Sequence, residues 1–326
     1  MAGIAAIPAP TIRDTMRKFL LFSLRVLVSA ALLYFALRSI NFASVQERFS
    51  QVNVWWLLLA VGATLFQIAL GALRWHQISA LSEAPLSMVQ ALRYNLIGAF
   101  FNQTLPSTIG GDAMRLWLVQ RHAGWRAATY SVLVDRAIGF IALASIVIAS
   151  LPWSYELITN QTGRIALLLI DVGAVLAGAG FLLLRYLPWE GLKRIWPIRH
   201  IHACSVIASK ALFGRESGPK VIVTSILIHV MTVVITWFTV FAISANAGFE
   251  QLFLLIPPIM LVTMLPVSIA GWGVREATMM VAFGYAGLAT ADGTVVSLLF
   301  GAVFFLVGGI GGVVWMLSPE EASPSR

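Results

Sequence analysis

The sequence predicts an all-α polytopic membrane protein with about seven to nine membrane segments, and three observations support this class. First, 59% of the 326 residues are hydrophobic and 11% are charged, whereas about 25% are charged in ordinary soluble domains. Second, several apolar runs reach the roughly 20 residues that one helix needs to cross a bilayer. Third, two Pro- and Gly-containing stretches recur in the two halves of the chain, which predicts re-entrant hairpins within an inverted-topology repeat.

The clearest apolar runs define the expected spans in chain order. They cover 19–38, 54–73, 127–150, 164–184, 221–244 and 294–317. Arg13, Arg17 and Lys18 precede a full-length span rather than a short signal core, so we expect 1–18 to be an arm and 19–38 to remain as the first helix. The run 277–290 is short for a span, which leaves open the side of the membrane on which the tail 318–326 lies.

Lys and Arg residues are distributed unevenly among the connections between spans. The arm carries three, 112–126 carries three and 185–220 carries seven, whereas 151–163, 245–250 and 291–293 carry none. Because basic connections are retained in the cytoplasm, this pattern predicts a cytoplasmic N-terminus. It also makes 94–115 leave from the cytoplasmic side and return to it, as a re-entrant hairpin would. The same reasoning gives 251–275 as a second hairpin that enters from the outside.

The two candidate hairpins contain matching motifs. Residues 105–115 read LPSTIGGDAMR, and residues 265–275 read LPVSIAGWGVR. Pro lacks a backbone donor and Gly exposes the backbone, so both interrupt a helix. Unpaired backbone at membrane depth is tolerated where it lines a watery cavity. Substrate contact is therefore expected at Pro106, Ser107, Gly110 and Gly111 in the first motif and at Pro266, Ser268, Gly271 and Gly273 in the second. A packing kink is the alternative reading.

Ionisable residues inside the apolar runs are a second pointer to a site, because charges there are costly unless they are paired or face a cavity. Asp135 and Arg136 lie within 127–150. Adjacent residues on a helix point about 100° apart, so each needs a partner elsewhere. Asp112 and Arg115, at i and i+3, can pair with each other.

Other polar and small residues in the spans receive simpler interpretations. By the spacing argument we expect Arg275 and Glu276 not to pair. Arg25 and Asp171 are expected to reach the interface by snorkelling. His229 is expected to be a hydrogen-bonded packing residue, and Gly308 and Gly312 are expected to form a helix-packing face.

The basic segment 185–220 joins the membrane halves 19–184 and 221–317. Ile198, Ile201, Ser205, Ala208 and Leu212 keep helical spacing, which predicts an interfacial amphipathic helix held by anionic lipids. A solvated linker is the alternative. The net charge of +8 gathers in such connections, which argues against nucleic acid as a partner. Cys204 is the single cysteine, and no metal-ligand spacing is present.

Three ordered motifs resemble the lysylphosphatidylglycerol synthase membrane-region family. They are FFNQTLPSTIGGDAMR (100–115), SVLVDRAIG (131–139) and LPVSIAGWGVREA (265–277). The resemblance implies a flippase-like protein of the bacterial inner membrane that handles phospholipids, hopanoids or polyprenyl-linked lipids. It adds Asn102 and Glu276 to the candidate residues. The soluble aminoacyl-transfer domain of the namesake enzymes has no counterpart in this sequence, so lysyl-lipid synthesis is not expected.

Together these features predict a lipid flippase in which Arg115, Arg136 and Arg275 hold an anionic headgroup. Catalytic motifs and a phosphate-binding loop are missing from the sequence, so we expect neither an enzyme nor a cofactor. A subunit of a lipid-modifying enzyme and a non-transporting scaffold of envelope synthesis remain as alternatives. A homo-oligomer is compatible with the sequence.

Overall fold

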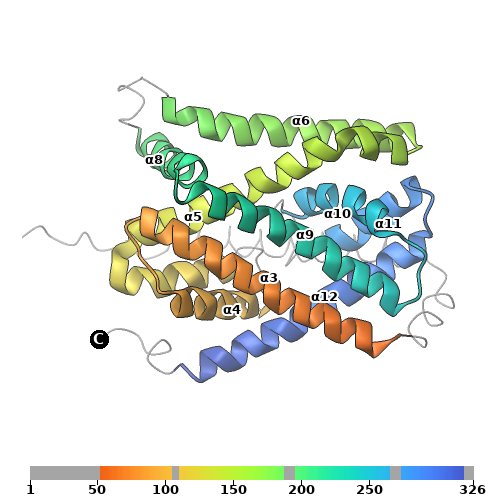
Figure 1. Ribbon diagram of the computed structural model, residues 1–326, viewed down its shortest axis with the longest axis horizontal. Helices are drawn as coiled ribbons and strands as arrows, with labels where there is room; N and C mark the ends of the chain where they lie inside the picture. The colour runs from red at the N-terminus through yellow and green to blue at the C-terminus, as the bar shows by residue number, and fades with distance from the viewer. Residues whose placement is uncertain (1–51, 105–109, 187–194, 265–272, 319–326) are drawn as a thin grey trace, which may run out of the picture.

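A computed structural model describes residues 52–104, 110–186, 195–264 and 273–318, which form helices and no strand (Figure 1). The elements are α3 (Val54–Leu81), α4 (Met88–Thr104), α5 (Gly110–Leu157), α6 (Gln161–Leu183), the short 3₁₀ turn η1 (Leu184–Tyr186), α8 (Trp196–Phe213), α9 (Gly218–Ala242), α10 (Phe249–Thr263), α11 (Val274–Tyr285) and α12 (Thr290–Met316). The all-α polytopic class is thus confirmed.

Five helices in the described part of the chain are long and apolar enough to cross a membrane: α3, α5, the α6–η1 unit Gln161–Tyr186, α9 and α12. They coincide with five of the six expected spans to within two residues at the C-terminal ends of α9 and α12, and the sixth expected span, 19–38, lies outside the described residues. By their length and composition, these helices indicate a multi-pass membrane protein.

Helices α3 and α9 lie side by side and run in opposite directions (Figure 1). The backbone N–H of Asn53, just before α3, donates to the carbonyl of Ala242 at the end of α9 (2.8 Å). Halfway along, the Gln67 amide donates to the Ile228 carbonyl and to the Thr232 hydroxyl, both at 2.7 Å. This antiparallel pair brings the two halves of the chain into contact.

Two pairs of shorter helices pack against the long ones. Helix α5 has two arms, 110–123 and 125–157, because Gly124 between them adopts φ 79°. The first arm packs against α4, and α11 packs against α10. Helix α4 has 17 residues and α11 has 12, so at 1.5 Å per residue they are about 25 and 18 Å long, less than the roughly 30 Å of a hydrocarbon core.

The α4 pair (α4 with the first arm of α5) and the α10 pair (α10 with α11) each begin and end at the same end of the bundle, which we call the opening of the pair. The opening of the α4 pair lies beside the end of α3, where Trp75, Leu86 and Ala128 share a hydrophobic cluster. The α10 pair opens at the opposite end. There the backbone N–H of Thr159, just after α5, donates to the carbonyl of Tyr285 at the end of α11 (3.3 Å). The run 277–290, expected as a short span, is therefore mostly the second member of this pair, since α11 ends at Tyr285.

A glycine face joins α12 to α4. A Cβ on Gly311 would lie 1.9 Å from the carbonyl oxygen of Leu96, and a Cβ on Gly312 would lie 2.9 Å from the Phe100 ring. A Cβ on Gly308 would lie 3.2 Å from Gln103. The expected role of Gly308 and Gly312 in helix packing is confirmed, and Gly311 makes the closest approach.

The segment between the halves contains α8, as expected from its helical spacing, and α8 lies at the end of α6 (Figure 1). Cys204 and Ala208 of α8 pack against Val134 and Ile138 of α5. This contact places α8 next to the part of α5 that contains Asp135 and Arg136.

Candidate functional site

Five charged side chains from α3 and the two arms of α5 meet in one cluster, which we call the charge cluster: Arg74, Asp112, Arg115, Asp135 and Arg136. Asp135 accepts from Arg74 Nε and from Arg115 Nη2, each at 2.9 Å. Asp112 accepts from Arg115 Nη1 at 3.2 Å. Asp112 also accepts two hydrogen bonds from Arg136, at 2.5 and 3.0 Å. The five groups thus form one continuous chain of ion pairs.

The cluster confirms two expectations about pairing. Asp112 and Arg115 pair locally, and the adjacent Asp135 and Arg136 find their partners elsewhere. Arg74 is the partner that the sequence analysis did not identify, because it lies just after the apolar run 54–73. The helix continues to Leu81, which carries Arg74 inside the bundle.

Glycines bring α4 close to the first arm of α5 and so place Arg115. A Cβ on Gly111 would lie 2.2 Å from the Gly98 carbonyl oxygen, so no side chain fits there. The Gly111 N–H donates to the Asn102 side chain (2.8 Å), which satisfies one of the free donors at the start of the arm. Gly110, the first residue of the arm, is buried. Asn102, Gly110 and Gly111 therefore shape the site without belonging to its ion pairs.

A shell of neutral groups holds the arginines in place. The Arg115 guanidinium lies 3.9 Å from the centre of the Trp75 ring, and the Trp75 N–H donates to Ser131 (3.0 Å). Arg74 donates to Ser225 at 3.4 Å and lies against Gly139. Trp75 is fully buried, so it belongs to the core that supports Arg115.

His229 contacts Gly139, the residue against which Arg74 lies. One of its ring nitrogens lies 2.9 Å from the Gly139 carbonyl oxygen, and its role as a hydrogen-bonded packing residue is confirmed.

Exposure divides the cluster into a closed and an open part. The side chains of Arg74, Arg115 and Asp135 are 9%, 7% and 5% exposed, whereas that of Arg136 is 46% exposed. Three guanidinium groups face two carboxylates, so the cluster carries one surplus positive charge. The Nε of Arg115 is buried and has no hydrogen-bond partner. The arrangement can accept an anion beside Arg136 without losing its internal pairs.

The second motif forms a smaller polar group on α11 and α12. Arg275 donates to Glu276 (2.9 Å) and to Ser297 of α12 (3.0 Å), and Ser297 donates to Glu276 (2.9 Å). Glu276 also accepts from the backbone N–H of Gly273 (2.6 Å), which adopts φ 83°, a conformation that favours glycine. The expectation that Arg275 and Glu276 cannot pair is therefore wrong: their long side chains meet where Ser297 bonds to both.

The sequence-predicted residues thus separate into two groups. Asn102, Gly110, Gly111, Asp112, Arg115, Asp135 and Arg136 meet around α5, and Gly273, Arg275 and Glu276 meet on α11. Pro106, Ser107, Pro266, Ser268 and Gly271 lie outside the described residues.

Asp171 was expected to snorkel to an interface, and this is wrong. It is the eleventh residue of the 23-residue α6 and is 3% exposed. Neither of its carboxylate oxygens has a hydrogen-bond partner. Asp171 is therefore a buried acid outside the charge cluster.

Fold and site define a multi-pass helical membrane protein with a buried, net-positive ion-pair network. The model of the lysylphosphatidylglycerol synthase TM region matches residues 22–312, so the chain belongs to that family, as its motifs indicated. Membership places it among membrane proteins of lipid-related processes. No curated protein and no solved structure matches the chain.

Proposed function

We propose that this protein is a lipid flippase of the bacterial inner membrane and that the charge cluster binds the anionic headgroup of its substrate. The observation that carries the proposal is the surplus positive charge of three arginines against two aspartates, with Arg136 exposed at one end. The substrate class is a phospholipid or a lipid-linked hopanoid or polyprenyl compound with a phosphate. Guanidinium groups suit it because they bind phosphate through two parallel hydrogen bonds.

The position of Arg136 along its helix favours a ligand over plain solvent contact. Trp125 and Trp153 are each 60% exposed, and they are separated by about 42 Å of helix, close to the 40–45 Å of a bilayer with its headgroups. Arg136 lies about 16 Å from Trp125, which is within the hydrocarbon core. An exposed charge at that depth is costly unless it faces a polar cavity or an ionic partner.

The repeated arrangement of helices supports transport across the membrane. Shifting the first half by the 160 residues that separate the two motifs places α4 at 248–264, within one residue of α10 at each end. The same shift places α3 over α9, and the arms of α5 over α11 and α12, to within five residues. Because α3 and α9 are antiparallel, we infer an inverted repeat whose two short-helix pairs enter from opposite sides. Many transporters alternate access around such a repeat.

Charge distribution supports an orientation with the N-terminus in the cytoplasm. The basic α8 segment and the opening of the α4 pair lie at one end of the bundle, where Ile78 of α3 packs against Ala208 of α8. Basic residues are retained on the cytoplasmic side. This end would thus be cytoplasmic, and the opening of the α10 pair would be external.

Proteoliposomes test the transport step. Fluorescent phosphatidylglycerol and phosphatidylcholine would be incorporated with the purified protein, and dithionite quenching would report the lipid that changes leaflet. Arg136→Gln should slow phosphatidylglycerol movement at least tenfold, and Arg136→Lys should restore only part, since an ammonium lacks the planar fork. Arg126→Gln, an exposed arginine on the same arm, is the matched control. Normal movement in Arg136→Gln would contradict the assignment of the site.

The alternatives give different results in the same preparation. A lipid-modifying enzyme subunit would change the mass of the added lipid. A scaffold would move no lipid, either as the parent protein or as any variant of the charge cluster.

Topology is tested separately in a Cys204→Ala background. Ser87→Cys, before α4, and Glu250→Cys, at the start of α10, should be labelled by an impermeant thiol reagent from opposite faces. Labelling from one face would overturn the inverted repeat.

A further inference from the structure

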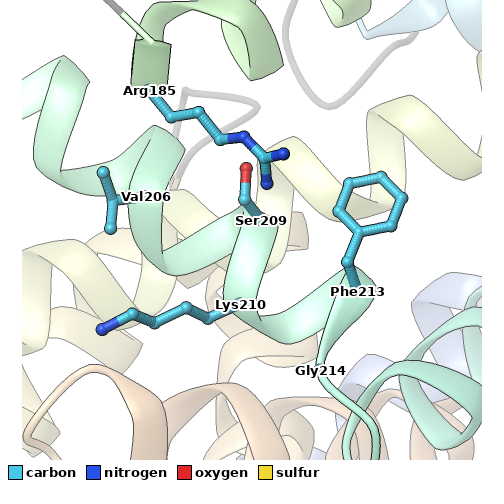
Figure 2. A pocket seen from close by; sticks show the side chains of 6 residues that line it. All are labelled: Arg185, Val206, Ser209, Lys210, Phe213 and Gly214. Carbon is cyan, nitrogen blue, oxygen red and sulfur yellow. The ribbon is translucent and has the colours of Figure 1, made fainter.

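An open hollow of about 310 Å³ lies at the junction of η1 and α8, and no residue of the charge cluster lines it. Figure 2 shows it between Arg185 at the end of the α6 unit and the last turns of α8. Its lining residues are Arg185, Val206, Ser209, Lys210, Phe213 and Gly214. The hollow therefore combines a guanidinium, a hydroxyl, an aromatic ring and the stem of a lysine.

Ser209 is the feature that points to a ligand. It is 3% exposed, and its hydroxyl has no hydrogen-bond partner. A buried hydroxyl without a partner costs stability, so a site is expected to supply one. In Figure 2 the Ser209 hydroxyl points toward the Arg185 guanidinium. Both groups are donors, and an anionic oxygen between them would accept from each.

Arg185 is held by aromatic rings. Its guanidinium carbon lies 4.2 Å from the centre of the Tyr186 ring and 5.6 Å from that of Phe213. Lys210 extends away from Arg185 in Figure 2, so it lines the hollow with its methylene groups. The guanidinium is thus restrained beside the hollow, while its charge has no carboxylate partner among the ion pairs of the described residues.

The surroundings of the hollow suit a lipid headgroup better than a free phosphate ion. Two large aromatic side chains beside Arg185 are exposed, Tyr186 at 64% and Phe213 at 67%. The segment 195–220 contains one acidic residue, Glu216, and four basic residues: Arg199, Lys210, Arg215 and Lys220. Exposed aromatics interleaved with cations are typical of segments that lie in a membrane interface.

We propose that this hollow binds the phosphodiester of an anionic phospholipid, with Arg185 and Ser209 donating to its oxygens and its acyl chains lying along the exposed rings. The site is distinct from the charge cluster and does not depend on transport. Because it joins the end of the first membrane half to α8, a bound lipid would fix the segment that connects the two halves.

Lipid binding to delipidated full-length protein in a non-ionic detergent tests the proposal. Dioctanoyl phosphatidylglycerol is titrated and bound lipid is counted by native mass spectrometry, with dioctanoyl phosphatidylcholine and inorganic phosphate as separate arms. Arg185→Gln should remove one bound phosphatidylglycerol or weaken it at least tenfold. Arg199→Gln, which removes an exposed cation of α8 outside the hollow, should leave that lipid in place. Arg136→Gln should also retain it, which separates this site from the transport site.

Ser209→Ala gives a second, opposite readout. In delipidated protein it should leave the melting temperature unchanged or raise it, because an unpartnered hydroxyl is removed. The rise in melting temperature that phosphatidylglycerol produces should shrink. Equal losses in Arg185→Gln and Arg199→Gln would show diffuse attraction and overturn the proposal. Saturation of the site by inorganic phosphate, or equal binding of phosphatidylcholine, would overturn its lipid or anionic character.

Discussion

Asp135 and Asp171 form a natural pair for testing what the charge cluster contributes to stability. Both are aspartates buried within long apolar helices, at 4% and 3% exposure. Asp135 uses both oxygens, one for Arg74 and one for Arg115. Asp171 uses neither. The same substitution, Asp to Asn, therefore removes two buried ion pairs in one case and none in the other.

Asp135→Asn should destabilise the protein by about 3–5 kcal/mol, the usual cost of breaking a buried pair from one side. Asn keeps one acceptor oxygen, but its amide group then faces a guanidinium donor. Asp171→Asn should remain within about 1 kcal/mol of the parent or be more stable, since no partner is lost. Adding Arg74→Gln to Asp135→Asn should recover part of the loss, because one stranded charge is removed with its mate.

Cys204 provides the assay. It is the single cysteine, is 4% exposed and packs against Val134 and Ile138, beside Asp135. Its alkylation under increasing sodium dodecyl sulfate, quenched after short pulses, reports the unfolded fraction of each variant. Equal destabilisation by Asp135→Asn and Asp171→Asn would refute the reasoning, because burial and not pairing would then set the cost. If Asp135→Asn caused no loss of stability, Asp112 and solvent would satisfy Arg74 and Arg115 as well as the Asp135 carboxylate does.

Two further predictions concern packing and thiol chemistry. Gly311→Ala should destabilise by about 1–3 kcal/mol, because its Cβ would lie 1.9 Å from the Leu96 carbonyl oxygen. Gly309→Ala, with nothing within 4 Å, should be neutral or stabilising; comparable thermal melts for both would argue against this helix contact. Burial raises the pKa of the Cys204 thiol to about 11, so in the folded protein its iodoacetamide reaction should stay slow between pH 7 and 9 and accelerate only toward pH 11. Rapid labelling at pH 8 would show that α8 opens.

The membrane spans could be predicted from the sequence because one-dimensional hydropathy is sufficient for them. A run of about 20 apolar residues is a helix wherever it lies in a bilayer. The ends of the helices were harder to predict from the sequence, and the end of one helix determines whether Arg74 joins the charge cluster. Helix α3 extends to Leu81, eight residues beyond the apolar run, and this extension places Arg74 opposite Asp135.

Pairing could be predicted in principle but not in detail. The geometry of one helix showed that Asp135 and Arg136 need separate partners, and the structure supplies Arg115 and Asp112 among them. The same geometry failed for Arg275 and Glu276, because it treated side chains as fixed vectors. A guanidinium and a glutamate carboxylate both have enough rotatable bonds to converge on a third group, Ser297. Asp171 was misjudged because hydropathy does not show which helix face is covered.

In the inverted repeat that we propose, the two halves differ in charge, and this difference bears on how the proposed site would act. With the 160-residue shift, Arg115 matches Arg275, whereas Asp135 and Arg136 match Val295 and Val296. Arg275 instead meets a carboxylate on its own helix and a hydroxyl of α12. The first half therefore has a surplus cation with an exposed side chain, Arg136, whereas in the second half Glu276 is fully buried. Under the proposed function, an exchange of conformations between the halves would leave the anion site in the first half, and the headgroup would meet the same arginines from either side of the membrane.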